Sequence, residues 1–356
     1  MDLNDLGYNQ EFEKFRTEQN LSGFEIGRVV AEHRDRYTIK TAENEYEAEI
    51  TGHMRFTAKS REDFPAVGDW VALTAYEGGF AIIHKIFPRY SIIKRQAVGQ
   101  TGEVQVIATN IDFAFLVQAA DRDFNLNRLE RYLTICNSAG VIPIIVLTKI
   151  DLIPETRLQE IVNSIHQRIK QISILTISNE TLTGYEGLKN AIQPGKTYCM
   201  LGSSGVGKST LLNNLSGKTV MKTDVISAAT QKGRHVSSHR ELIVLEIGGI
   251  LIDNPGMREV GVADAPGGLE ITFDRIIQLA RDCKFKDCTH QHETGCAILE
   301  ALENGEIDPS AYDNYMKIQR EKSFFESTLA ERRKKEKQFG KMYKHVMKDV
   351  KKYKNL

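Results

Sequence analysis

A short glycine-rich segment in the middle of the 356-residue chain constrains the fold more than any other feature. The segment GSSGVGKS matches the pattern G-x-x-x-x-G-K-[ST]. It follows the apolar run KTYCML and precedes leucines at helical spacing. A strand, a glycine loop and a helix in this order are the context that this phosphate-binding motif requires. Backbone N–H groups of such a loop and the N-terminus of its helix together hold phosphate oxygens. The sequence therefore predicts an α/β domain that binds a nucleotide.

The glycine loop and the first helical turn after it contain the residues that this motif uses. The predicted nucleotide contacts are Gly202, Ser203, Ser204, Gly205, Val206, Gly207, Lys208, Ser209 and Thr210. The lysine of the motif, Lys208, would reach the β- and γ-phosphates, and the hydroxyl of Ser209 would bind Mg²⁺. A chance glycine turn is the alternative, but both the motif and its context argue against it.

A second motif indicates which base is bound. TKID, from Thr148 to Asp151, ends an apolar run and resembles the guanine-specificity motif [NT]-K-x-D. The Asp151 carboxylate can accept from both N1–H and the 2-amino group of guanine, and adenine offers neither of these donors. The aliphatic stem of Lys149 can cover the base plane. Ser178 and Asn179, after the run ISILTI, are predicted to complete the guanine site.

A third motif, and the order of all three, indicate the type of nucleotide-binding domain. DNPG follows the run GILI and resembles the D-x-x-G motif of GTPases. Asp253 would hold Mg²⁺ through water, and the Gly256 N–H would contact the γ-phosphate. In ordinary GTPases the phosphate-binding loop comes first and the specificity motif late, whereas here TKID precedes the loop. A permuted chain can build the same parallel sheet. The sequence therefore predicts a circularly permuted GTPase domain.

Three of the five cysteines lie close together in the C-terminal third. Cys283, Cys288, His290 and Cys296 form the pattern C-x₄-C-x-H-x₅-C. Three thiolates and one imidazole suit a tetrahedral structural zinc ion, and four protein ligands leave no position for catalysis. His292 is the alternative to His290. The odd number of cysteines argues against a secreted disulfide framework and favours a reducing, cytoplasmic location.

Short strand-like runs follow a polar helical segment over residues 1–20. FEIGRVVA, RYTIKT, EYEAEITG, DWVAL and FAIIHKI are separated by turn residues. Five short strands at this spacing predict a small β-barrel of the OB or SH3-like type. Such a barrel either binds nucleic acid or acts as a spacer.

From Val104 the strand and helix patterns alternate, and after residue 265 the pattern is helical. We therefore expect three domains: an OB-like β-barrel in residues 1–96, a permuted α/β P-loop GTPase domain in 97–265 and a helical zinc-binding domain in 266–356. No apolar run reaches the length of about 20 residues that a membrane span needs, and the N-terminus lacks the apolar region of a secretory signal. We expect a cytoplasmic monomer that does not bind membranes.

Charge is distributed unevenly along the chain. Lys+Arg and Asp+Glu number 47 each, but residues 331–356 alone hold eleven basic and three acidic side chains, a net charge of +8. The other residues therefore carry −8. A concentrated basic tail on an acidic body predicts a polyanionic partner such as nucleic acid, and a solvated helical end is the alternative.

Taken in chain order, the barrel, the permuted motifs, the C-x₄-C-x-H-x₅-C cluster and the basic tail resemble the RsgA (YjeQ) family of small-ribosomal-subunit-dependent GTPases. The resemblance extends over nearly the whole chain. It implies an OB-fold domain, a permuted GTPase domain and a zinc domain. It also implies GTP hydrolysis that the small subunit stimulates during its late maturation. GTP or GDP, the small subunit and its rRNA are the partners that the family implies.

The resemblance also assigns roles in the segment GRHVSS, residues 233–238. It points to His235 as the catalytic residue that positions water, which a neutral imidazole near the γ-phosphate can do. Ser237, or alternatively Ser238, takes the place of the threonine that closes on Mg²⁺. Asn179 departs from the alanine that usually follows the serine of this family's guanine site.

Rival functions stay open on the sequence alone. A P-loop ATPase or kinase would share the glycine loop, but TKID argues against it. An RNA-binding assembly factor could use GTP only as a structural switch ligand. A permuted GTPase that acts on the large subunit is a narrower rival, against which the zinc spacing argues.

Overall fold

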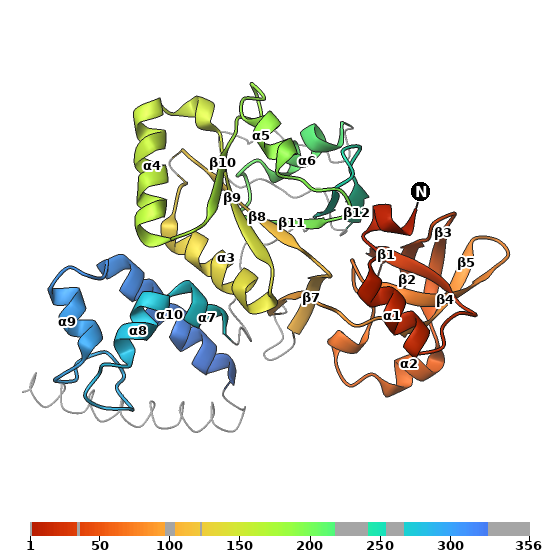
Figure 1. The fold of residues 1–356 in the computed structure, drawn as a ribbon, viewed down its shortest axis with the longest axis horizontal. Helices are drawn as coiled ribbons and strands as arrows, with labels where there is room; N and C mark the ends of the chain where they lie inside the picture. The colour runs from red at the N-terminus through yellow and green to blue at the C-terminus, as the bar shows by residue number, and fades with distance from the viewer. Residues whose placement is uncertain are drawn as a thin grey trace, which may run out of the picture.

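The chain folds into a β-barrel, a central α/β domain and a C-terminal group of helices (Figure 1). The computed structural model describes residues 2–33, 36–96, 104–121, 123–217, 241–253 and 267–326. The predicted multidomain fold class is confirmed. The domain boundaries after residues 96 and 265 stay predictions, because the segments that follow them lie outside the described ranges.

Five strands form the closed barrel that the sequence predicted. They are β1 (Glu25–His33), β2 (Arg36–Lys40), β3 (Glu45–Ile50), β4 (Trp70–Tyr76) and β5 (Phe80–Ile86). Their order is β1-β2-β3-β5-β4, and pairing of β1 with β4 closes the barrel. β3 and β5 run parallel and the other neighbours antiparallel, which fits a Greek-key barrel of the OB type. Two short helices, α2 (Gly52–Thr57) and η2 (Arg61–Asp63), lie between β3 and β4.

The N-terminal segment packs on the barrel. It forms η1 (Leu3–Leu6) and α1 (Gln10–Glu18), and Asn9 caps α1 by accepting from the Phe12 N–H. Leu6 and Phe12 are buried in one cluster with Trp70. The predicted polar helix is therefore amphipathic, and its apolar face forms part of the barrel's outer core.

The central sheet has the order β10-β9-β8-β11-β13-β12. Its strands are β8 (Phe113–Ala119), β9 (Ile142–Thr148), β10 (Ser173–Thr176), β11 (Thr197–Leu201), β12 (Glu241–Val244) and β13 (Ile250–Asp253). The first five strands in this order are parallel, as predicted, and β12 is antiparallel to β13. The predicted strand LIVLEI is shorter than expected, because the chain turns back at Leu245 to Gly249.

Helices cover both faces of this sheet. They are α3 (Leu126–Ala139), η3 (Ile150–Leu152), α4 (Glu155–Arg168), α5 (Tyr185–Asn190) and α6 (Lys208–Ser216). Leu129 of α3 and Ile161 of α4 pack in one core cluster with one set of strand side chains. Leu188 of α5 and Leu211 of α6 pack in another cluster, with the strand side chains that alternate with the first set and point to the opposite face of the sheet. α3 and α4 therefore lie on one face, and α5 and α6 on the other.

The barrel and the central domain are joined in two ways that the sequence did not predict. β1 pairs with β12 at Ala31 and Glu241, so the barrel and the central sheet form one continuous sheet. The second connection is the hairpin of β6 (Ile92–Gln96) and β7 (Val104–Thr109), which links the last barrel strand to the first strand of the central sheet along the chain.

Arg28 of the barrel joins three segments at this junction. Its guanidinium donates to the carbonyls of Leu6 (2.6 Å), Gly68 (3.1 Å) and Asn110 (3.0 Å). The side chain is 1% exposed, and burial lowers its pKa to about 10. Removing this buried cation would leave the Leu6 carbonyl without a donor, whereas the Gly68 carbonyl would keep its bond from the Asn110 amide and the Asn110 carbonyl its bond from the Tyr90 hydroxyl.

We expect Arg28→Met to destabilise the barrel by about 3 kcal/mol, because three hydrogen bonds of a buried cation are lost and the Leu6 carbonyl keeps no donor, which costs more than the methionine recovers by packing. Urea unfolding followed by the fluorescence of Trp70, the single tryptophan, measures this directly. Arg36→Met is the matched control in the same barrel, since the Arg36 side chain is 68% exposed. Equal midpoints for the two variants would contradict the structural role of Arg28.

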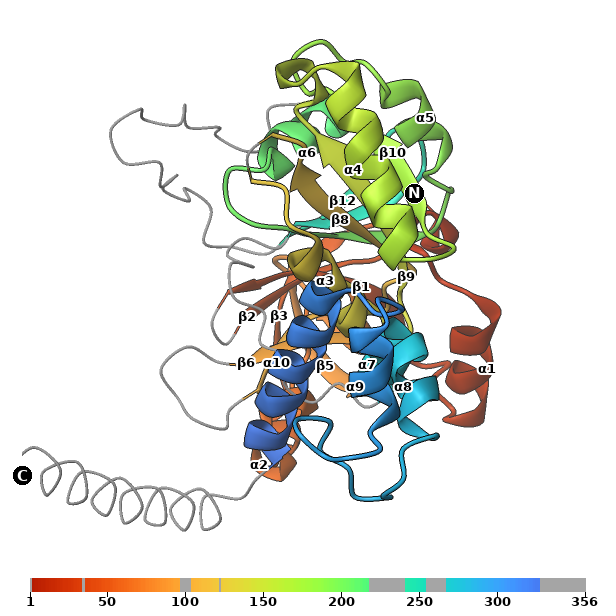
Figure 2. The ribbon, with the colours of Figure 1, turned by 90° about the vertical axis from the view of Figure 1, so that its left-hand side faces the viewer.

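Residues 267–326 form four helices after the central domain: α7 (Gly268–Thr272), α8 (Asp274–Ala280), α9 (Ala297–Glu303) and α10 (Pro309–Glu326). α7 and α10 contact α3, which therefore lies between the sheet and the C-terminal helices (Figure 2). Arg131 of α3 forms a bidentate ion pair with Glu321 of α10 at 2.6 Å. Among the described residues, no helix combines the length and apolar character that a bilayer span requires.

Candidate functional site

The predicted nucleotide residues converge on one edge of the central sheet. The glycine loop follows β11, and Thr148, the first residue of TKID, is the last residue of β9. Ser178 and Asn179 follow β10, and Asp253 is the last residue of β13. These four strands are parallel, so their carboxyl ends lie at the same edge. β11 and β9 flank β8 on its two sides, which makes this edge a switch point in the strand order. Open α/β sheets bind their ligands at such points.

The glycine loop connects β11 to α6 as the motif predicted. Gly205 and Gly207 adopt φ angles of +82° and +93°, which side chains rarely tolerate. A Cβ on Gly202 would lie 2.4 Å from the Val117 carbonyl oxygen, so the loop must begin with glycine. The Val206 side chain is buried in the core cluster that contains Leu211 and so anchors the loop to the domain. The loop is therefore shaped by its sequence to expose backbone N–H groups.

Lys208 begins α6 and lies over the glycine loop. Its ammonium donates to the carbonyls of Gly202 (2.7 Å) and Ser203 (2.6 Å). Ser209 and Thr210 follow in the first turn of α6 and are partly exposed. A phosphate held by the loop would lie next to this ammonium and to the N-terminus of α6.

The TKID residues have different environments. Thr148 is fully buried, and its hydroxyl donates to the Val206 carbonyl at 2.7 Å, so it ties the end of β9 to the glycine loop. Lys149 adopts a left-handed conformation with φ +58°, and its ammonium lies 3.4 Å from the Asp121 carboxylate. Asp151 is exposed in η3. Of the three, Asp151 is exposed and Lys149 is partly exposed, so both side chains are accessible to a base.

Ser178 and Asn179 shape the turn after β10. The Ser178 hydroxyl accepts from the N–H groups of Glu180 and Thr181, which closes the turn. The Asn179 amide donates to the Gly207 carbonyl at 3.0 Å. This asparagine therefore contacts the glycine loop, which the sequence analysis had not predicted.

The remaining predicted nucleotide residues divide into two groups. Asp253 ends β13 and is 7% exposed at the same sheet edge. His235, Ser237, Ser238 and Gly256 lie outside the described residues, so their predicted roles stay predictions.

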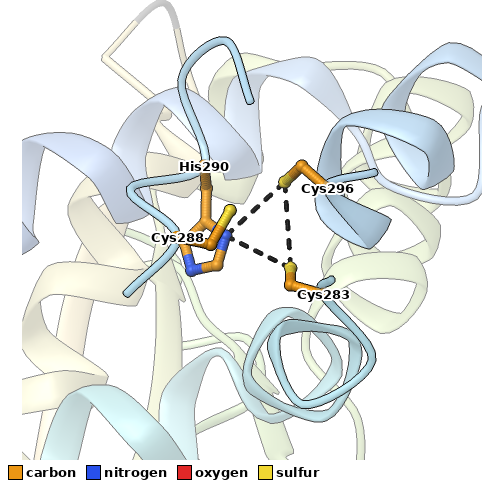
Figure 3. Close-up of side chains that lie close together, drawn as sticks. All are labelled: Cys283, Cys288, His290 and Cys296. Carbon is orange, nitrogen blue, oxygen red and sulfur yellow. Dashed lines mark hydrogen bonds between the residues drawn. The ribbon is translucent and has the colours of Figure 1, made fainter. Parts of the chain in front are cut away.

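The four predicted zinc ligands lie together between α8 and α9 (Figure 3). The Nδ1 atom of His290 lies 3.6 Å from the Cys283 sulfur and 3.5 Å from the Cys296 sulfur, and these sulfurs are 3.9 Å apart. Tetrahedral zinc with bonds of about 2.1–2.3 Å requires ligand separations close to these. His292 is not in the group. The donor set and its spacing fit a structural zinc ion.

Neighbouring residues hold the ligand loop in shape. His290 has a φ of +62°, and the Tyr312 hydroxyl of α10 donates to its carbonyl at 2.6 Å. The Glu293 carboxylate accepts from the N–H groups of Thr289 (2.8 Å) and Gln291 (3.0 Å). Hydrogen bonds from Thr289 hold the pKa of Glu293 well below its usual range.

Two residues at the nucleotide site, Asp121 and Tyr132, belong to none of the predicted motifs. Asp121 follows β8 and forms an ion pair with Lys149, and Tyr132 of α3 interacts with Ser203 of the glycine loop. Burial is the main cause that raises the pKa of Tyr132. The sequence offers one signal for Asp121: it follows a run of buried residues, as the motif residues do.

Fold and site together define a P-loop GTPase whose motifs occur in permuted order. The family model described as RsgA GTPase matches residues 86–263. The chain is 42% identical to the small ribosomal subunit biogenesis GTPase RsgA 2 of Lactiplantibacillus plantarum, over 92% of this chain and 91% of the relative. It is 38% identical to the RsgA of Methanosarcina acetivorans, over 89% and 85%.

Solved structures agree with these relatives. YjeQ from Thermotoga maritima is 26% identical with a TM-score of 0.60, and the match covers 83% of this chain and 96% of that one. YloQ, a circularly permuted GTPase, shares the fold with a TM-score of 0.59 at 24% identity, and the match covers 86% of this chain and 97% of that one. The chain belongs to the RsgA GTPase family, and its enzymatic activity is GTP hydrolysis.

Proposed function

We propose that this GTPase acts in the biogenesis of the small ribosomal subunit and that the small subunit stimulates its GTP hydrolysis late in maturation. One observation carries the part on biogenesis: a relative named as a small ribosomal subunit biogenesis GTPase is 42% identical over 92% of the chain. The intact guanine and phosphate motifs at one sheet edge support it, because both parts of a GTP site are present together.

For hydrolysis we assign the phosphates to the N–H groups of the glycine loop and to Lys208. Ser209 and Asp253 lie on elements that meet at the same edge, and with Ser237 we assign them to Mg²⁺. Bound Mg²⁺ neutralises charge that develops on the phosphates. We assign His235 to the attacking water. A partner that completes such a site can supply about 10³–10⁵ in rate, so we expect slow turnover by the chain alone.

For the base we assign Asp151 to the polar edge of guanine and Lys149 to its plane, with Ser178 beside them. Gly256 is assigned to the γ-phosphate. At the second site we propose one structural zinc ion on Cys283, Cys288, His290 and Cys296. Zinc there would hold the loop between α8 and α9 and would take no part in hydrolysis.

A surface on the barrel supports contact with rRNA. Phe56 of α2 is 90% exposed, and the exposed cationic residues Arg55 and Lys59 lie beside it in sequence. α2 lies on the side of the barrel remote from α5 and α6 (Figure 1). An exposed aromatic ring between cations suits an unpaired base and its phosphates. The basic residues 331–356 add positive charge that would favour binding to the phosphates of rRNA. We also propose that the chain is located in the cytoplasm and is a monomer.

We expect Phe56→Ala to weaken small-subunit binding by about tenfold, because stacking of one base contributes about 1–3 kcal/mol. The melting temperature should not change, since the ring is exposed. Binding measured by co-sedimentation over a range of protein concentrations tests this. Tyr76→Ala is the control, because Tyr76 is an exposed aromatic of the same barrel beside Glu77. Equal binding by both variants would remove this surface from the proposal.

A further inference from the structure

Asn179 contacts two structural elements through its side chain. Its Nδ2 atom donates to the Gly207 carbonyl at 3.0 Å, and its Oδ1 atom accepts from the Tyr185 hydroxyl at 2.7 Å. Gly207 ends the glycine loop and caps α6, and Tyr185 begins α5. The asparagine therefore connects the turn after β10 with the loop that holds phosphate.

A further residue fixes the same turn from α6. The Nδ2 atom of Asn214 donates to the Asn179 carbonyl at 3.1 Å and to the Tyr185 hydroxyl at 2.9 Å. Tyr185 is 6% exposed, and burial raises its pKa to about 12, so its hydroxyl stays protonated at neutral pH. The phenol can then donate to Asn179 while it accepts from Asn214. The three polar side chains therefore form one hydrogen-bonded network.

The geometry at Gly207 shows how closely the two loops approach. A Cβ at Gly207 would lie 2.5 Å from the Asn179 amide nitrogen, so the amide occupies space that any other residue at 207 would need. One residue earlier, the Val206 carbonyl accepts from Thr148 at 2.7 Å. Two consecutive carbonyls of the glycine loop are therefore each held by a loop of the guanine site.

We propose that Asn179 is a positioning residue that locks the guanine-binding turn to the phosphate-binding loop. A nucleotide binds at its base and its phosphates at once, so its affinity depends on how well the two loops are held at the correct separation. Holding them before binding reduces the ordering cost of association. An alanine at 179 could make neither side-chain bond. The proposal rests on GTP binding by this chain and does not depend on the ribosomal partner.

The expected result of Asn179→Ala is about tenfold weaker binding of GDP and GTP, with the change mainly in the dissociation rate. The hydrolysis rate at saturating GTP should stay within about twofold, because Asn179 acts through the loop and not on the reacting atoms. Stopped-flow binding of a fluorescent GDP analogue, with phosphate release at several GTP concentrations, separates the two effects. Asn190→Ala, on the exposed end of α5, is the matched control and should bind like the parent chain.

Tyr185→Phe provides a second test that does not depend on folding of the first variant. It removes the bonds of the hydroxyl with Asn179 and Asn214 and leaves the bond from Asn179 to Gly207, so the loss of affinity should be about threefold. Combining both substitutions should cost less than the product of their separate effects, because they act through one network. Unchanged dissociation rates in both variants would overturn the proposal. So would a lower hydrolysis rate at saturating GTP with unchanged affinity. If the parent chain failed to bind GTP, the GTPase assignment itself would fall.

Discussion

Asp151→Asn should weaken GTP binding by at least about 10³ and should make xanthosine triphosphate the preferred nucleotide. The Asp151 carboxylate is exposed at the sheet edge, where it can accept from two guanine donors. An asparagine keeps one acceptor and presents an N–H₂ group to the guanine 2-amino group, so donor faces donor. Xanthine has a carbonyl at that position and pairs with the amide. Competition of GTP and xanthosine triphosphate against a fluorescent guanine nucleotide measures the switch.

Glu155→Gln is the matched control for this substitution. Glu155 is an exposed carboxylate at the start of α4, four residues after Asp151, and its oxygen accepts from Gln159. This variant should keep the parent's preference for GTP. A parallel loss for GTP and xanthosine triphosphate in Asp151→Asn would mean that the residue supports the fold of η3 and does not read the base.

Removing metal from the four-residue cluster should unfold the segment between α8 and α9. Among the described residues of this segment, turns and the ligand side chains provide most of the order. Structural zinc can contribute on the order of 10–16 kcal/mol to such a segment. We expect Cys288→Ser to lose at least about 10³ in zinc affinity and amide protection over residues 283–303, while β1 to β5 keep their protection.

His292→Ala separates this prediction from a general effect of changing the loop. His292 lies two residues after the ligand His290 but outside the cluster, so its variant should hold one equivalent of zinc. Zinc content by elemental analysis and hydrogen exchange by mass spectrometry are the two measurements. Retention of zinc and of protection in Cys288→Ser, or their loss in His292→Ala, would contradict the ligand assignment.

The parts of the fold that follow a short-range pattern could be predicted from the sequence. Each of the five barrel runs became a strand, and the strand–loop–helix context of GSSGVGKS became β11 and α6. The separated motifs at residues 148, 178, 202 and 253 were predicted to act in one nucleotide-binding domain, and the structure places them at one edge of the sheet, where the parallel strands end. The zinc cluster was predictable for a similar reason, since its ligands lie within one short segment.

Contacts between distant segments could not be predicted in this way. Pairing of β1 with β12 involves one residue pair, and Arg28 bonds to three carbonyl groups, which no side-chain pattern encodes. The place of Asn179 after β10 predicts a contact with the base, but does not reveal that its amide also bonds to Gly207. A single polar side chain has no periodicity, so only the structure reveals its partner.

Phosphate release from GTP and ATP, with and without purified small ribosomal subunits and at two salt concentrations, tests the central claim most directly. We predict slow release from GTP alone, no release from ATP, and acceleration by the subunit of about 10³-fold or more that weakens as salt rises. Release from GTP that the subunit does not change would keep the GTPase assignment but contradict the proposed role in small-subunit biogenesis.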